Sequence, residues 1–215
     1  MMFVATRMTE NPITVTPDTS VAEAKEIMNK NKFRRLPVVK DGKLLGIVTD
    51  RDLREVAPSP ATTLSKHEAN YLLDKILVRE IMKKNVLTIC ADATIEEAAL
   101  IMYREKIGGL VVVDVNAAVV GIITETDIFK SFVDVMGLAE GKTRITIGGV
   151  NKIGMLHEIT GVFHELNINI GSMVALSAPE EQGELIIRAD VVDIEDLTKK
   201  LNSHGYPVLH VAKIG

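Results

Sequence analysis

Two pairs of threonine and aspartate share the same spacing, Thr-x-x-Asp. Thr49 and Asp52 lie in the stretch of residues 46–53, and Thr124 and Asp127 lie in the stretch of residues 121–128. Apolar residues and a glycine before each threonine predict a buried strand, and the residues after each aspartate (53–56 and 128–136) predict a helix. Each pair is therefore expected at a strand-to-helix junction.

A junction of this kind supports two readings of the same side chains. The threonine hydroxyl can cap the helix, and the acid three residues later can complete a capping box, which stabilises the chain without a ligand. Alternatively, the free N–H groups and the positive end of the helix dipole favour a phosphate, and the aspartate can accept hydrogen bonds from a sugar diol. One copy of the motif does not decide between the two readings.

The similarity between the two stretches extends well beyond the motif. Residues 11–21 match residues 85–95 without a gap, Ile27-Met28 matches Ile101-Met102, and residues 36–39 match residues 110–113. This internal duplication predicts the order strand, helix, strand, hairpin turn, strand and helix in each copy.

The paired Gly-x-x-Thr-x-x-Asp motifs resemble the tandem cystathionine-beta-synthase (CBS) domains, also called a Bateman module, over roughly residues 1–136. The resemblance implies two repeats packed about a pseudo-two-fold axis, with clefts that take adenosine-containing ligands. It implies that Asp52 and Asp127 bind ribose hydroxyls and that Thr49 and Thr124 face phosphate or the adjoining polar group. It also implies that two stretches flank adenine, made of Thr14, Val15 and Thr16 in the first repeat and Thr88, Ile89 and Cys90 in the second.

The basic residues are unequally divided between the repeats. Arg34 and Arg35 stand where the second repeat has Gly108-Gly109, and Arg51 stands where it has Thr126. In the CBS family a basic residue near position 34 often meets ligand phosphates, whereas the alternative is a solvated arginine pair. We expect two unequal sites, because charge compensation for phosphate must come mainly from the first repeat. The sequence leaves open which cleft Arg34 and Arg35 serve.

The chain divides into five segments: repeat 1 (1–60), a connector with a helix over 66–77 (61–77), repeat 2 (78–137), a linker (138–142) and a third module (143–215). The third module reads strand-helix-strand-strand-helix-strand, which predicts a ferredoxin-like βαββαβ layer. The expected fold class is α/β, with an α+β third module.

This third module resembles the ACT domain, a small regulatory unit that in many metabolic proteins binds amino acids between copies. The resemblance makes the first turn a candidate amino-acid site, formed by Asn151, Gly154, Met155 and Leu156. Ile153 replaces the usual proline of that turn, and the alternative is a domain that only dimerises through its sheet edges. Both resemblances imply a homodimer or a larger assembly.

Composition excludes several classes of function. A formal net charge of -4 with evenly mixed signs argues against a nucleic-acid surface. The scattered histidines predict no metal site, and Cys90, the single cysteine, is expected to be a small buried residue. The start of the chain resembles no signal peptide, and no apolar run is long enough to cross a membrane, so we expect a soluble cytoplasmic protein.

The leading hypothesis is a non-catalytic sensor with no catalytic cofactor, whose regulatory ligand is AMP, ADP, ATP or S-adenosylmethionine. The module order resembles that of the bacterial acetoin utilization proteins, which implies a link to acetoin metabolism and a regulated metabolic enzyme as partner. The alternatives are a dimeric adaptor whose Thr and Asp residues only cap helices, and an amino-acid sensor acting through the third module. An enzyme ranks last, because no nucleophile has a base at a recognisable spacing.

Overall fold

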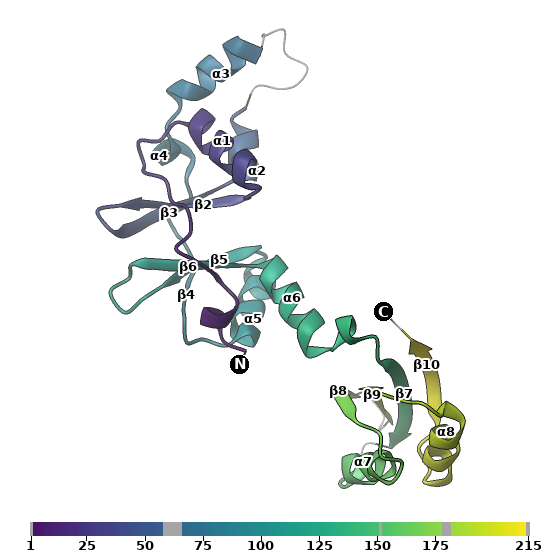
Figure 1. The fold of residues 1–215 in the computed structure, drawn as a ribbon. Coiled ribbons are helices and arrows are strands. Elements are labelled where there is room, and N and C mark those ends of the chain that lie inside the picture. Colours follow the sequence, from purple (N-terminus) through teal and green to yellow (C-terminus); the bar gives the residue numbers. More distant parts are fainter. Residues whose placement is uncertain (1, 58–65, 151, 178–181, 214–215) are drawn as a thin grey trace. The chain divides into compact units, whose positions relative to one another are not determined.

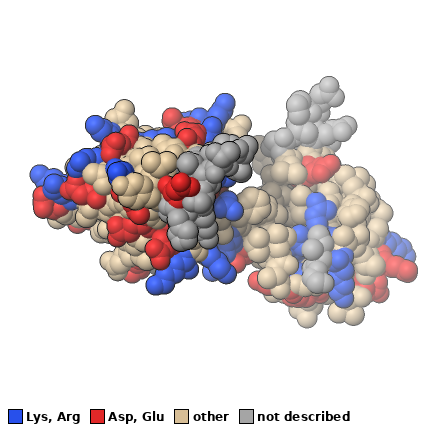
Figure 2. Space-filling view, turned by 90° about the horizontal axis from the view of Figure 1, so that it is seen from above, with Lys and Arg blue, Asp and Glu red and all other residues tan. Residues whose placement is uncertain are grey.

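The computed structural model describes residues 2–57, 66–150, 152–177 and 182–213. The chain forms two compact units, residues 1–128 and residues 129–215 (Figure 1). Helices and strands are mixed in both units, which confirms the predicted α/β class. Acidic and basic side chains are interspersed over the face shown in Figure 2, as the even mixing of charge in the sequence suggests.

The first repeat contains α1 (Val21–Asn31), the hairpin of β2 (Arg35–Lys40) and β3 (Lys43–Thr49), and α2 (Asp50–Glu55). Ser20 caps α1 by accepting a hydrogen bond from the Glu23 N–H. Asp41 and Gly42, with φ of 52° and 75°, form the predicted two-residue turn, whose geometry requires positive φ at both positions. The apolar face of α1 packs on the hairpin in one core cluster: Val15, Val21, Ala24, Met28, Leu36, Val38, Val48, Leu53, Leu73 and Val78.

The second repeat contains β4 (Thr88–Cys90), α5 (Ile95–Glu105), β5 (Gly109–Val113), β6 (Val119–Thr124) and the start of α6 (Glu125–Val135). Thr94 and Glu97 form a capping box at the start of α5. Both α2 and α6 begin directly after the motif threonine, three residues earlier than the apolar pattern predicted. The aspartate of each motif is therefore in the first helical turn.

Each repeat is completed by a segment that comes from outside it in the sequence. The N-terminal turn η1 (Val4–Thr6) and β1 (Thr9–Glu10) join the second repeat, where β1 pairs with β6 and Val4 N–H donates to the Ala93 carbonyl at 2.9 Å. The connector helix α3 (Lys66–Lys75) and α4 (Val78–Ile81), at the start of the second repeat in the sequence, join the first repeat, where Val78 N–H donates to the Thr19 carbonyl at 2.9 Å. The two exchanges are equivalent, so the repeats interlock about a pseudo-two-fold axis.

The connector helix α3 buries a narrow side in the first repeat. Leu73 lies in the core of that repeat, whereas Tyr71 and Leu72 are exposed. The Lys75 ammonium lies over the aromatic ring of Tyr71, 4.4 Å from the ring centroid. A narrow buried side is typical of a short helix with few apolar residues.

Cys90 is exposed, so the prediction of a buried cysteine is wrong. β4 is a short strand that pairs with β5 alone, in a sheet of order β1-β6-β5-β4. Successive side chains of a strand point to opposite faces, and here Ile89 takes the core position. Cys90 and Thr88 consequently point the other way.

The second unit contains the end of α6, the turn η2 (Leu138–Glu140), and the predicted βαββαβ module. Its elements are β7 (Thr143–Val150), α7 (Met155–Glu165), β8 (Ile170–Ser177), β9 (Gln182–Ala189), α8 (Ile194–Ser203) and β10 (Val208–Lys213), and the strands form an antiparallel sheet of order β10-β7-β9-β8. Both helices cover one face of this sheet, around a core that includes Ile145, Phe163, Ile187 and Leu197 (Figure 1). The predicted linker 138–142 lies inside this unit, where Ser172 Oγ donates to the Met136 carbonyl at 2.9 Å.

Candidate functional site

Both Thr-x-x-Asp pairs are closed by short hydrogen bonds at a helix start. Asp52 Oδ2 accepts from Thr49 N at 2.8 Å and from Thr49 Oγ1 at 2.6 Å. Asp127 Oδ2 accepts from Thr124 N and from Thr124 Oγ1, both at 2.8 Å. In the first repeat Asp52 N–H also donates to Thr49 Oγ1 at 3.3 Å, which completes the capping box, and in the second repeat Asp127 makes the same contacts to the residue before the helix. The negative charge is also favoured by the helix dipole. Capping does not exclude a second role, because a carboxylate has two oxygens and about four acceptor positions.

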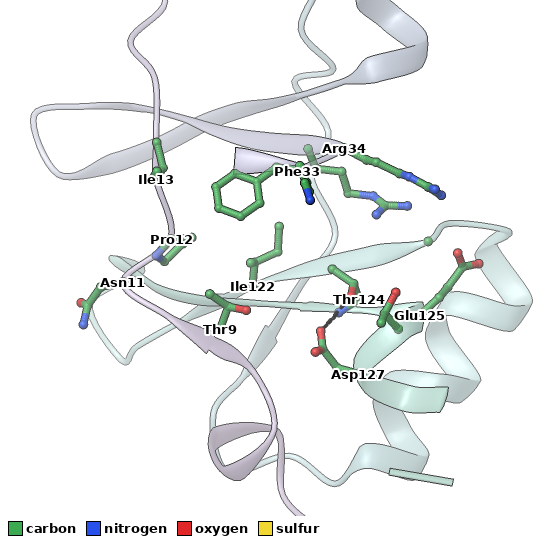
Figure 3. A pocket seen from close by; sticks show the side chains of 14 residues that line it. Thr9, Asn11, Pro12, Ile13, Phe33, Arg34, Ile122, Thr124, Glu125 and Asp127 are labelled. Carbon is green, nitrogen blue, oxygen red and sulfur yellow. Dashed lines mark hydrogen bonds between the residues drawn. The ribbon is translucent and has the colours of Figure 1, made fainter. Parts of the chain in front are cut away.

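A cavity of about 450 Å³ lies beside the second motif (Figure 3). Its walls come from four places in the chain: the N-terminal segment, the start of β2 with the loop before it, the loop before β5, and the junction of β6 with α6. The lining residues are Thr9, Asn11, Pro12, Ile13, Lys32, Phe33, Arg34, Arg35, Gly108, Ile122, Thr124, Glu125, Thr126 and Asp127. A cavity of this volume falls in the range of small-molecule and cofactor sites.

Arg34 and Arg35 line the cleft of the second motif, not the cleft of their own repeat. In Figure 3 Phe33 and Arg34 face Ile122 and Thr124 across the cavity. The Arg35 side chain passes over Gly108 so closely that a Cβ at position 108 would overlap its guanidinium and would lie 2.7 Å from Glu125 Oε2. Gly108 and Gly109, which align with Arg34 and Arg35 in the repeats, thus leave room for the Arg35 side chain.

The electrostatic balance of the cavity is slightly positive. Lys32, Arg34 and Arg35 face Glu125 and Asp127 across the lining. Burial lowers the pKa of the Arg35 guanidinium, and the nearby carboxylates of Glu125 and Asp50 oppose that shift. An arginine held partly away from water presents its donors to a ligand with less competition from solvent, which strengthens a charge-assisted hydrogen bond.

The apolar part of the lining comes from both repeats. Pro12 and Ile13 lie on the N-terminal segment, Phe33 precedes β2, and Ile122 lies on β6. Phe33 and Ile13 are among the exposed large hydrophobic side chains of the chain. An aromatic ring and three aliphatic side chains on one side, with threonine, aspartate and arginines on the other, suit a ligand with a flat apolar part and a polar part.

The cavity brings together five of the site residues predicted from the sequence: Arg34, Arg35, Thr124, Thr126 and Asp127. Val15 and Ile89 are buried in the two repeat cores instead, so their side chains are not available to a ligand. Arg51 pairs with Glu55 at 3.1 Å. The other predicted residues, Thr14, Thr16, Thr49, Asp52, Thr88 and Cys90, lie outside this cavity lining.

Nine lining residues were missed from the sequence, among them Thr9, Asn11, Phe33 and Glu125. The duplication aligns Asn11 with Asn85 and thus marks the segment as part of the repeat. Nothing in that alignment says that the segment crosses to the other copy, because strand pairing over more than a hundred residues leaves no local pattern.

The candidate amino-acid turn of the third module is partly described. Asn151 lies outside the described residues, Gly154 has φ of 91°, Met155 is buried in the core, and Leu156 is exposed. Beside this turn, Glu158 Oε2 accepts from Tyr206 Oη at 2.5 Å and pairs with Lys152 Nζ at 3.1 Å. The hydrogen bond from Tyr206, and then the one from Lys152, lowers the pKa of the Glu158 carboxyl.

Within the parts of the chain that the structure describes, no helix has the length and apolar character needed to cross a membrane. The same residues contain no group of three or more His, Cys, Asp or Glu side chains arranged to hold a metal ion.

Three solved structures share this architecture over the first part of the chain. A protein described as a putative acetoin utilization protein (AcuB) from Vibrio cholerae is 31% identical with a TM-score of 0.53, covering 65% of this chain and 96% of its own. The CBS domain pair of protein MJ0100, solved with 5′-methylthioadenosine and S-adenosyl-L-methionine, is 32% identical with a TM-score of 0.51, covering 60% and 98%. CBSX2 in complex with AMP is 28% identical with a TM-score of 0.52, covering 63% and 98%.

Relatives by sequence match a similar portion. A CBS domain-containing protein of Dictyostelium discoideum is 35% identical over 136 residues, which are 63% of this chain and 94% of the relative. The uncharacterized protein MJ1225 of Methanocaldococcus jannaschii is 36% identical over 128 residues, and the inosine-5'-monophosphate dehydrogenase of Aquifex aeolicus is 39% identical over 121 residues. The chain spans 46% of the length of MJ1225 and 22% of the length of that dehydrogenase.

The family models match three stretches of the chain. The CBS domain model matches residues 4–59 and 78–134, and the ACT domain model matches residues 143–204. The interlocked repeats and the βαββαβ module account for these matches in structural terms. The chain belongs to the CBS domain family, as a tandem CBS pair followed by an ACT domain.

Proposed function

We propose that this protein is a non-catalytic regulatory sensor that binds an adenosine nucleotide in the cavity beside Thr124 and Asp127. The observation that carries the proposal is the meeting of Asp127 with Arg34 and Arg35 around one cavity. Related CBS pairs support it, since CBSX2 was solved with AMP and the MJ0100 pair with two adenosine compounds.

Each part of such a ligand has a matching part of the lining. A ribose diol would donate to the Asp127 carboxylate, whose position is fixed by Thr124. Phosphate oxygens would accept hydrogen bonds from Arg34 and Arg35, and the adenine ring would lie against Phe33, Ile13 and Ile122. These side chains come from both repeats, so a bound nucleotide would bias how the repeats sit against each other.

The wider role follows from the module order. We infer a cytoplasmic homodimer that regulates a metabolic enzyme and is linked to acetoin metabolism, as the likeness to the Vibrio cholerae protein suggests. The ligand acts as a regulator, and the protein itself carries out no reaction. A coupling of about 1 to 3 kcal/mol between nucleotide and partner would suffice for such control.

The closed capping boxes favour one rival function, a dimeric adaptor with no nucleotide. A thermal-shift screen against AMP, ADP, ATP and S-adenosylmethionine separates the two. A nucleotide at 100 times its dissociation constant should add about 2.7 kcal/mol to the free energy of unfolding.

The Asp127→Asn variant should lose that stabilisation, and Asp52→Asn serves as the matched variant, because it changes the equivalent acid outside the cavity. If no adenosine compound raises the melting temperature of the wild-type protein, the adaptor function takes the place of the sensor.

A further inference from the structure

The cavity beside the second motif has an apolar end and a charged end. Pro12 and Ile13 lie at one end of the view in Figure 3. Glu125 lies at the other end, beyond Thr124 and Asp127. A nucleotide bound with its base on the apolar side would therefore extend its phosphate groups toward Glu125.

Glu125 shares its end of the cavity with Arg35. A Cβ at position 108 would touch the Arg35 guanidinium and would lie 2.7 Å from Glu125 Oε2, so the two charged groups flank the same point of the wall. Burial lowers the pKa of Arg35, and Glu125 opposes this shift more than any other carboxylate does. A phosphate group held by Arg35 would thus have a carboxylate as its neighbour.

Asp50 is the other acid whose charge acts on Arg35, but its carboxylate is held on its own helix. Asp50 Oδ2 accepts from Arg54 Nη2 at 2.8 Å within α2. Asp50 lies outside the cavity lining, whereas Glu125 is part of it. Glu125 is therefore the acid that a chain of several phosphate groups would approach.

The charges of the lining suffice for one phosphate group. The cations Lys32, Arg34 and Arg35 face the carboxylates of Glu125 and Asp127, which leaves a formal balance of +1. A phosphate monoester carries about −1.5 to −2 at pH 7, so one phosphate group already exceeds that balance. Each further phosphate group would bring more negative charge beside Glu125, and like charges at close range repel each other.

We propose that the cavity takes a nucleoside monophosphate in preference to the di- and triphosphates, and that Glu125 sets this limit. The inference rests on the proposed function for the adenosine part of the ligand, and it adds the number of phosphate groups. Glu125 lies between the threonine and the aspartate of the motif, at a position that the Thr-x-x-Asp pattern leaves open. A sensor with this preference would detect AMP in the presence of ATP.

The test is a calorimetric titration of the full chain with AMP, ADP and ATP, without divalent cations, which would neutralise part of the phosphate charge. The wild-type protein should bind AMP most tightly and ATP least tightly. Glu125→Gln removes the charge and keeps the size of the side chain, so the ratio of AMP affinity to ATP affinity should fall about three- to fivefold, as expected for one exposed charge pair. Glu105→Gln changes an exposed acid of the same unit outside the lining, so it is the matched control and should leave the ratio unchanged.

A second variant, Glu125→Lys, reverses the charge and should lower the ratio further, and it carries the test if circular dichroism shows that Glu125→Gln does not fold. Wild-type protein that binds ATP at least as tightly as AMP would overturn the role of Glu125 and leave nucleotide binding in place. The same ratio in Glu125→Gln as in the wild-type protein would also overturn it. Failure of the proposed function has a different signature, because the wild-type protein then binds none of the three compounds, and the preference for a monophosphate fails with it.

Discussion

A single methyl group at position 108 should weaken the binding of phosphate without replacing any side chain that is proposed to contact the ligand. In Gly108→Ala the new Cβ would lie 2.7 Å from Glu125 Oε2 and nearer still to Arg35 Nη2. Ordinary van der Waals contact begins at 3.4 Å, so Glu125 Oε2 must move by about 0.7 Å. The Arg35 guanidinium, which is nearer to the new Cβ, must move further. Both clashing groups are the ends of flexible side chains, so they can move.

The expected effect on folding is small and the expected effect on binding is larger. Replacing Gly by Ala reduces the freedom of the unfolded chain, and this offsets part of the strain, so the free energy of unfolding should change by less than about 1 kcal/mol. A hydrogen bond to a charged group contributes about 1.5 to 3 kcal/mol. Losing about half of it, roughly 0.75 to 1.5 kcal/mol, raises the dissociation constant of AMP about four- to twelvefold.

The assay compares AMP with adenosine, which has the same ribose and base but no phosphate. Calorimetry on Gly108→Ala should show weaker binding of AMP and unchanged binding of adenosine. Gly161→Ala is the control, because its Cβ would meet nothing within 4 Å and it lies in the other unit. Equal losses for AMP and adenosine would refute the assignment of Arg35 to the phosphate, as would unchanged affinity for both compounds.

Three further predictions concern stability. Gly161 lies inside α7 with open space around its Cβ, so Gly161→Ala should raise the free energy of unfolding of the ACT unit by about 0.5 to 1 kcal/mol, measured by urea titration. Thr94→Ala removes the cap of α5 and should lower the free energy of unfolding of the CBS unit by about 0.5 to 2 kcal/mol, and an unchanged urea midpoint would contradict the cap. The pKa of Glu158 is lowered in the folded state, so its stabilising contribution is complete above the ordinary pKa of 4.5 and is lost as the pH falls through the lower folded value. Unfolding curves below pH 4.5 should therefore depend less on pH in Glu158→Gln than in the wild-type protein.

The elements of the fold could be predicted because their determinants are local. The apolar spacing of Val21, Ala24 and Met28 indicates the helix α1, and the Asp41-Gly42 pair indicates the hairpin turn. The Thr-x-x-Asp capping of α2 follows from four consecutive residues. In each case a short window of sequence contains both of the partners that interact, so no knowledge of the tertiary fold was needed.

The walls of the cavity could not be predicted in the same way. Thr9 meets Ile122, and Phe33 faces the second motif, through contacts between segments far apart in the chain. Cys90 shows the same limit on a smaller scale, because the apolar character of its strand did not indicate which of two neighbouring side chains would be buried. Arg34 and Arg35 line the cleft of the second motif because the loop before β2 faces the other repeat. The composition of the chain does not indicate which repeat a loop faces.

Because η1 and β1 belong to the second repeat in the fold, they also determine which truncated forms of the chain can fold. A fragment that starts at residue 78, the beginning of the second match to the CBS family, would lack the strand that pairs with β6 and the turn that covers α5. The exposed backbone of β6 would then be open to pairing with other chains, which favours aggregation. A single repeat expressed alone therefore needs the crossing segment fused to it, and an affinity tag placed directly before residue 9 would lie beside the cavity that Thr9 lines.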